Sequence, residues 1–161
     1  MLTHKAKYAL QALRVLAEAT AGAPAGMPRV TLPIHEIADR AHAPRKFLEA
    51  ILLDLRRHGF VDSVRGKAGG YALARRSDRI PLSEVIRAID GPLAPIPCAS
   101  LTAYRPCADC TDPEQCALRR VMREVRDATA AILDGRTIAD LARLPVQPAG
   151  ERVWVAAREK A

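Results

Sequence analysis

All four cysteines of this 161-residue chain lie between residues 98 and 116, with the spacing Cys98-x8-Cys107-x2-Cys110-x5-Cys116. Thiolates are soft ligands that suit an iron-sulfur cluster or tetrahedral zinc, and they suit magnesium or calcium poorly. In a reducing compartment, clustered cysteines are more often metal ligands or redox-active thiols than disulfides. The four thiols therefore predict a metal or redox site.

The spacing leaves the cofactor open. Structural zinc sites more often contain two Cys-x2-Cys pairs, and this chain has only one, Cys107 and Cys110. The same pair is also compatible with a thiol-disulfide switch. Cysteines that merely fill space are disfavoured, because Asp109, Asp112 and several prolines mark residues 92–116 as a surface loop.

Little else in the sequence predicts catalysis. The four histidines are scattered over the first sixty residues, and no nucleophile-base pair, paired carboxylate or cofactor fingerprint is present. An enzyme that uses the thiols or a metal is a remote alternative. The net charge of +7 favours a polyanionic partner such as nucleic acid. We expect a cytoplasmic protein without a membrane partner, because neither a signal peptide nor a membrane span is recognisable.

The cysteine loop is expected to connect two helices. The first, "IPLSEVIRAIDG", ends at Gly91, and the second is expected to start at Pro113 and to end before Gly135. Cys116 would lie in its first turn, where the helix dipole favours a thiolate. "TIAD" predicts a short terminal helix within residues 113–144, and 145–161 read as a tail. The long helix carries an apolar stripe that invites pairing with a second copy: Leu118, Val121, Met122, Val125, Ala128, Ile132 and Leu133.

Residues 1–91 predict a winged helix-turn-helix domain, so the fold class is mostly α with a small β-hairpin wing. Apolar residues at helical spacing predict helices over 3–20, from Pro33, and over 44–58. The runs 60–65 and 71–75 flank the glycine-rich "GKAGG" and predict a hairpin with a basic tip. This order of elements is typical of winged helix-turn-helix proteins, whose second turn-linked helix fits the DNA major groove.

The candidate DNA-binding residues lie on the helix 44–58 and at the hairpin tip. Side chains near the start of a recognition helix reach base edges, which selects Arg45, Lys46 and Glu49. Arginine and lysine donate to guanine, and glutamate accepts from cytosine. At the tip, arginine can enter a narrow minor groove, and glycine allows close approach to phosphates. The tip candidates are Arg65, Gly66 and Lys67.

Over residues 2 to about 143 the sequence resembles the Rrf2 family, the IscR, NsrR and RirA type of bacterial repressors. The resemblance depends on "KYALQALRVLAE", "RKFLEAILLDLRRHGFVDSVRGKAGGYALAR" and "IPLSEVIRAIDG" followed by clustered cysteines. It implies a homodimer joined through the long helix, a wing in the minor groove, and an iron-sulfur cluster (2Fe-2S or 4Fe-4S) that changes operator affinity. Two-fold symmetry then requires a palindromic operator.

By position, the resemblance makes Lys46 and Glu49 recognition-helix readers and Arg65 the wing arginine. Cys98, Cys110 and Cys116 occupy the three-cysteine pattern of the family.

The chain departs from the family at the fourth ligand. Some members use a carboxylate on the first helix, where this chain has Lys7, and others use a histidine three residues after the last cysteine, where it has Arg119. The additional thiol, Cys107, is the expected replacement. The alternatives are a zinc-stapled regulator and a cluster-free regulator that responds to thiol oxidation or to a small effector.

Overall fold

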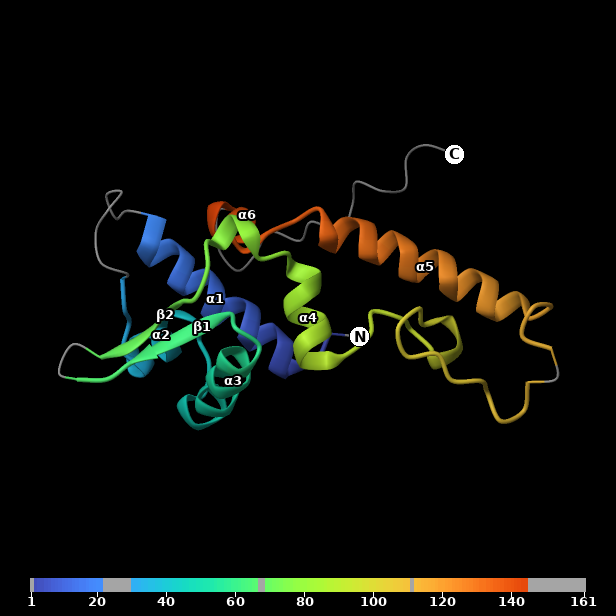
Figure 1. Cartoon of the computed structure of the whole chain (residues 1–161), viewed down its shortest axis with the longest axis horizontal. Helices are drawn as coiled ribbons and strands as arrows, with labels where there is room; N and C mark the ends of the chain where they lie inside the picture. Colours follow the sequence, from blue (N-terminus) through green and yellow to red (C-terminus); the bar gives the residue numbers. More distant parts are fainter. Residues whose placement is uncertain (1, 22–29, 67–68, 111, 145–161) are drawn as a thin grey trace.

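A computed structural model of the chain describes residues 2–21, 30–66, 69–110 and 112–144. The fold is mostly helical with one two-stranded antiparallel sheet, as the sequence predicted. The helix α1 runs through the middle of the molecule, the hairpin projects from one end, and α5 reaches the opposite end (Figure 1). In chain order the elements are α1 (His4–Ala21), α2 (Ile34–Arg40), α3 (Arg45–Arg57), β1 (Val61–Val64), β2 (Gly70–Leu73), the 3-10 helix η1 (Ser77–Arg79), α4 (Leu82–Asp90), the 3-10 helix η2 (Pro97–Ala99), α5 (Ala117–Asp134) and α6 (Ile138–Arg143).

One hydrophobic core surrounds α1, which packs against α2, α3, α4, α6 and β2. Leu13 and Leu16 of α1 are buried in this core together with Phe60, which precedes β1. Ile138 of α6 is fully buried in the same core. Full burial of a Leu, Ile or Phe side chain contributes about 1.5–3 kcal/mol. The last described helix therefore helps to stabilise the N-terminal domain.

The helices α2 and α3 are joined by a tight turn. Pro33 and Pro44 are the N-cap residues of the two helices, close to the predicted starts. In the turn, Ala43 N donates to Ala38 O at 2.9 Å. His42 between them has a φ of 49°, and it is the one non-glycine residue with positive φ in the part of the chain that the structure describes. This left-handed conformation costs a residue with a Cβ about 1–2 kcal/mol.

Replacing His42 by glycine (H42G) is expected to raise the free energy of unfolding by about 0.5 to 1 kcal/mol, because glycine adopts positive φ without a steric penalty. Chemical denaturation measures the difference. The control is His35→Gly at an exposed position inside α2, which should lower the stability because glycine disfavours helix. A loss of stability in both variants would contradict the assignment of strain to His42.

The strand β2 of the hairpin also pairs with a third extended segment. The strands pair Val64 with Gly70, and Tyr71 of β2 exchanges two backbone hydrogen bonds with Leu32, at 2.8 and 2.9 Å. A Cβ on Gly70 would lie 2.2 Å from the carbonyl oxygen of Leu32. Glycine is therefore required where β2 crosses the segment that leads into α2.

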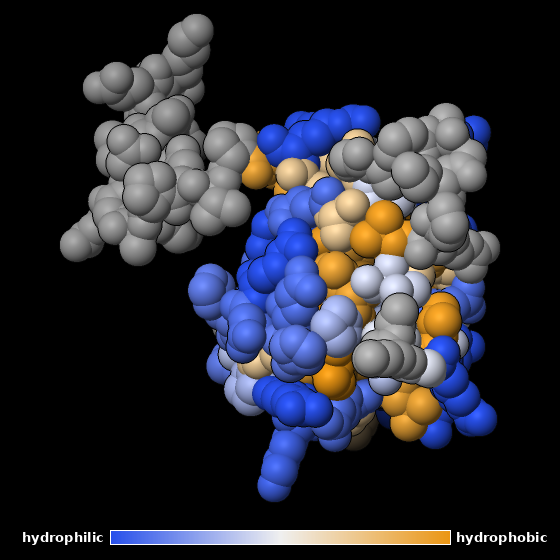
Figure 2. Space-filling model, turned by 90° about the vertical axis from the view of Figure 1, so that its left-hand side faces the viewer, coloured by the Kyte–Doolittle hydropathy of each residue, from blue (hydrophilic) through white to orange (hydrophobic). Residues whose placement is uncertain are grey.

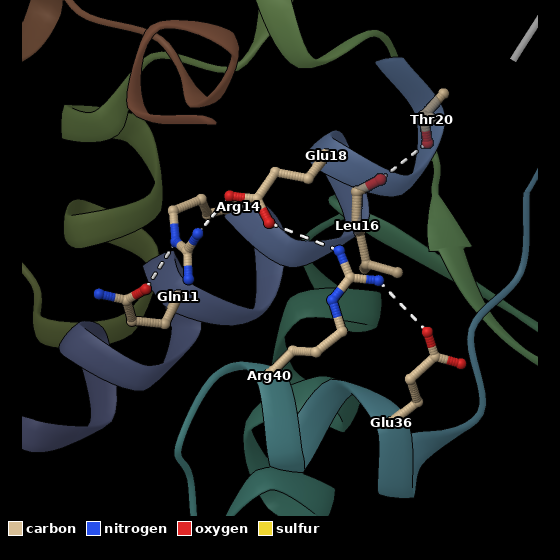
Figure 3. A network of polar contacts seen from close by, with 7 residues as sticks. All are labelled: Gln11, Arg14, Leu16, Glu18, Thr20, Glu36 and Arg40. Carbon is tan, nitrogen blue, oxygen red and sulfur yellow. Dashed lines mark hydrogen bonds and ion pairs between the residues drawn. The ribbon is translucent and has the colours of Figure 1, made fainter. Parts of the chain in front are cut away.

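Charged side chains connect α1 to α2 at the surface (Figure 3). Arg40 of α2 lies 3.5 Å from a carboxylate oxygen of Glu18 on α1 and 3.2 Å from Glu36, one turn earlier on α2. Glu18 also pairs with Arg14, whose Nε donates to Gln11 Oε1 at 2.8 Å. An isolated exposed ion pair contributes about 0–1 kcal/mol, but charges in a network support each other. The network holds α2, and the turn that follows it, against α1.

The long helix α5 begins at Ala117, so the prediction that it starts at Pro113 is wrong. Asp112 Oδ1 accepts a hydrogen bond from Glu114 N at 2.9 Å, which forms a local turn in place of helix. Cys116 is the N-cap residue, and its Sγ accepts the N–H of Arg119 at 3.4 Å. Cys116 therefore precedes the first helical turn instead of lying within it.

The short terminal helix α6 has the predicted start. Thr137 and Asp140 form a reciprocal capping box, and the hydrogen bonds from Thr137 lower the pKa of the Asp140 carboxyl. Leu82 N donates to Arg136 O at 2.9 Å, which fastens the chain before α6 to the start of α4. Among the described helices, none is both long and apolar enough to span a membrane.

Candidate functional site

The helix α3 has one buried face and one charged face. The three side chains predicted to read bases, those of Arg45, Lys46 and Glu49, are all exposed near its start. Arg45 Nε lies 3.8 Å from Glu49 Oε1, and the two side chains are 63% and 56% exposed. Such a pair is weak, so both charged groups can turn toward a ligand. The opposite face of α3 is fully buried in the core and consists of Leu48, Ile51, Leu52 and Leu55.

Two contacts with α1 fix the position of α3. Lys5 Nζ lies 2.7 Å from Asp54 Oδ2, and this hydrogen bond lowers the pKa of the Asp54 carboxyl. Tyr8 packs edge to face against Phe47, with the ring centroids 5.9 Å apart. The first turn of α3 therefore projects from the domain in a defined direction.

The hairpin tip carries the other candidates. Arg65 and Gly66 are exposed, and Gly66 has a φ of 118°, which glycine adopts readily. Gly69 N donates to Gly66 O at 2.9 Å. Lys67, predicted to contact phosphates, lies outside the described residues. Seen from the hairpin end, hydrophilic side chains surround a narrower apolar strip (Figure 2).

Two of the four cysteines are in contact. Cys98 on η2 is buried and Cys107 is exposed, and their Sγ atoms are 3.7 Å apart. The Cys107 thiol donates to Cys98 Sγ, and this hydrogen bond raises the pKa of Cys107. Nearby, Arg105 N donates to Pro97 O at 3.4 Å and draws the two ends of this part of the loop together. The pair in contact is thus not the Cys-x2-Cys pair that the sequence singled out.

Three of the thiols border an open hollow beside the loop. Cys107, Cys110 and Cys116 line this hollow, whose volume is about 440 Å³. Cys107 therefore connects the buried Cys98 with the remaining two cysteines. Within residues 2–21, 30–66, 69–110 and 112–144, no three His, Cys, Asp or Glu side chains form a group that could hold a metal ion. That all four thiols bind one cofactor stays a prediction.

The contact between Cys98 and Cys107 fits a shared metal ion. A tetrahedral thiolate site with bonds of about 2.3 Å has sulfur-sulfur edges of about 3.8 Å, close to the 3.7 Å between these two atoms. The backbone N–H that Cys116 Sγ accepts is the kind of hydrogen bond that orients a thiolate ligand. The separation of these two thiols therefore fits neighbouring ligands of a thiolate-bound metal or cluster.

Comparison with known proteins shows which family the chain belongs to. The sequence model of the Rrf2 family, described as an iron-dependent transcriptional regulator, matches residues 2–144. The chain belongs to the Rrf2 family. An HTH-type transcriptional regulator of Rhodobacter capsulatus, named rrf2-like, is 46% identical over 142 residues, which cover 88% of this chain and 91% of the relative.

Two solved structures show the same fold as this Rrf2 chain. CymR, the global cysteine regulator of B. subtilis, matches with a TM-score of 0.68 at 29% identity over 88% of this chain and 95% of its own. IscR of T. potens matches with a TM-score of 0.64 at 26% identity over 88% of this chain and 85% of its own. The two-stranded hairpin and the turn-linked helices are thus the winged-helix domain of an Rrf2 regulator. The chain is a transcriptional regulator and not an enzyme, as the sequence predicted.

Replacing Glu49 of this Rrf2 protein by alanine (E49A) is expected to relax the preference for one base pair by about 1–3 kcal/mol, because a carboxylate selects the donor of cytosine. Duplexes that differ by single base pairs, compared at one salt concentration, measure the preference. The control, Arg57→Ala at the exposed far end of α3, should leave the order of preference unchanged. An E49A variant with an unchanged preference would remove Glu49 from the set of base-reading residues.

Proposed function

We propose that the chain is a homodimeric repressor of a palindromic operator, and that a cofactor bound by the cysteine loop changes its operator affinity. The observation that carries this proposal is the position of the thiols. All four lie between α4 of the winged domain and α5, the helix expected to join the subunits. A ligand at this joint can alter the angle between the two parts.

The proposal of a dimer depends on the exposed surface of α5. Large apolar side chains aligned on one helix face and open to solvent typically mark an interaction surface. Two-fold pairing of α5 would place two α3 helices against half-sites about 34–36 Å apart. The exposed fractions are 61% for Leu118, 50% for Val121, 43% for Val125 and 66% for Ile132.

An iron-sulfur cluster, 2Fe-2S or 4Fe-4S, is the proposed cofactor, with Cys98, Cys107, Cys110 and Cys116 as ligands. When bound, it would supply an iron-dependent and redox-sensitive connection between the loop and the start of α5. The family's description as iron-dependent supports this choice. The cysteine loop and the wing lie at opposite ends of the molecule (Figure 1), so the cofactor would act through the subunit arrangement and not through contact with DNA.

The test compares operator binding by anaerobically purified protein and by the same protein after removal of iron. Iron, zinc and acid-labile sulfide are assayed on each sample. A switch that moves the equilibrium between two forms by about 1–3 kcal/mol changes the operator affinity about 5 to 150-fold. We expect a difference in this range at one salt concentration. Equal affinity of the two forms would exclude a regulatory cofactor.

The contact between Cys98 and Cys107 favours a second candidate, a zinc-containing or cluster-free regulator that responds to oxidants. The two Sγ atoms, now 3.7 Å apart, would have to approach to about 2.05 Å. A peroxide would take two electrons from the thiols and the two thiol protons, leaving a disulfide and two molecules of water. Zinc without sulfide, together with a Cys98–Cys107 disulfide found by peptide mass spectrometry after peroxide treatment, would favour this candidate over the cluster.

A further inference from the structure

Arg119, in the first turn of α5, contacts both ends of the cysteine loop. Its Nε donates to the carbonyl oxygen of Cys98 at 3.0 Å, and its Nη1 donates to the carbonyl oxygen of Pro113 at 3.1 Å. Nη1 also donates to Glu114 Oε1 at 2.8 Å. We propose that Arg119 is a positioning residue that holds the thiols in place for a metal without being a ligand itself. The part that concerns the metal rests on the proposed function.

The contacts of Arg119 join residues that are far apart in the sequence. Cys98 lies near the beginning of the loop and Pro113 near its end. The bonds of one side chain therefore oppose the conformational entropy that favours an open loop. A guanidinium has five N–H donors in a planar fork and can serve several carbonyl groups at once. The Arg119 side chain is only 15% exposed, and its guanidinium lies 5.8 Å from the ring centroid of Tyr104. The Arg119 side chain is therefore packed within the loop.

The backbone of Arg119 also reaches the thiols, because its N–H donates to Cys116 Sγ at 3.4 Å. One residue thus bonds the peptide group of the first cysteine and the sulfur of the last. Hydrogen bonds of this kind orient the ligand atoms of a metal site. Arg119 thus supports metal binding from the position where some family members have a histidine ligand.

A second arginine, two turns further along α5, acts on the same part of the loop. Arg126 is buried, and its Nη1 donates to the carbonyl oxygen of Ala99, next to Cys98. Arg126 thereby fixes η2 on α5. Only Arg119 of the two also contacts Pro113, so the loss of Arg119 alone should open the loop around Cys98 while η2 stays on α5.

The test uses cobalt(II) as the metal probe with the full-length protein under anaerobic conditions. Arg119→Gln is expected to weaken cobalt affinity about 10 to 100-fold, the usual effect of losing a residue that supports metal ligands. Affinity is measured from the thiolate-to-cobalt absorption in competition with a chelator. Arg119→Lys should restore little, because a single ammonium nitrogen lacks the planar fork of donors with which the guanidinium serves both carbonyl groups. The control is Arg120→Gln, an exposed position on the same turn, which should bind cobalt like the unaltered protein.

A second readout does not depend on a cofactor. Cys98 is buried, so its reaction with a maleimide in the metal-free protein should be slow. The reaction should become several-fold faster in Arg119→Gln and Arg119→Lys. It should not change in Arg120→Gln. Unchanged Cys98 reactivity together with unchanged cobalt affinity in both Arg119 variants would overturn the proposal. If even the unaltered protein binds no cobalt while Cys98 becomes reactive in the variants, the metal site fails and the positioning role stands. Retention of the unaltered far-ultraviolet circular dichroism spectrum shows that the variants fold.

Discussion

Replacing Val125 by aspartate (V125D) is expected to separate the proposed dimer and to weaken operator binding by at least about 100-fold. Val125 lies in the middle of the exposed apolar stripe of α5. Two-fold pairing would bury two new carboxylates close to each other, and unpaired buried charges are strongly unfavourable. A monomer reaches only one half-site and loses the gain in affinity, about 10² to 10⁴-fold, that linked binding sites provide.

Sedimentation velocity and operator binding, measured over the same range of protein concentration, test this expectation. The matched control is Ala131→Asp, which adds the same charge at an exposed position of α5 outside the stripe. The control should remain dimeric and keep its affinity. A dimeric V125D protein with normal affinity would show that subunits do not pair through this face of α5.

The winged domain could be predicted from the sequence because its signals are local. Apolar residues at helical spacing identified α1 and α3, and Pro33 and Pro44 identified the starts of α2 and α3. The same rule failed at Pro113, because Asp112 forms a turn with Glu114 and Cys116 takes the N-cap position. A proline thus permits a helix start, but competing side-chain hydrogen bonds decide where the helix begins.

The internal arrangement of the cysteine loop could not be predicted from spacing alone. The thiols of Cys98 and Cys107 are in contact, because loop backbone bonds and Arg119 draw together residues that are distant in the sequence. On a helix, arginine usually marks a solvent-exposed face, so the roles of Arg119 and Arg126 were not recognised. One signal was present for Arg126, whose neighbours four residues away on either side, Met122 and Ala130, are apolar.

Replacing Gly70 by alanine (G70A) is expected to lower the free energy of unfolding by about 2–4 kcal/mol and to impair operator binding through the wing. The added Cβ would lie 2.2 Å from the backbone oxygen of Leu32, an atom that cannot rotate away as a side chain could. The protein must then move β2 away from Leu32, and the two hydrogen bonds between Leu32 and Tyr71 are lost or stretched. Overpacking costs about 1–3 kcal/mol, and each lost hydrogen bond about 0.5–1.5 kcal/mol.

Chemical denaturation and operator binding of G70A separate a loss of stability from a loss of wing function. The matched control is Ser63→Ala on β1, directly across the hairpin from Tyr71, where the exposed side chain accepts a surface hydrogen bond from Arg56. Its stability should change by less than about 0.5 kcal/mol. If the crossing at Leu32 fixes the wing, folded G70A protein at low temperature will still bind its operator more weakly than the Ser63→Ala protein does. Normal binding by folded G70A would mean that the tip reaches DNA without this support.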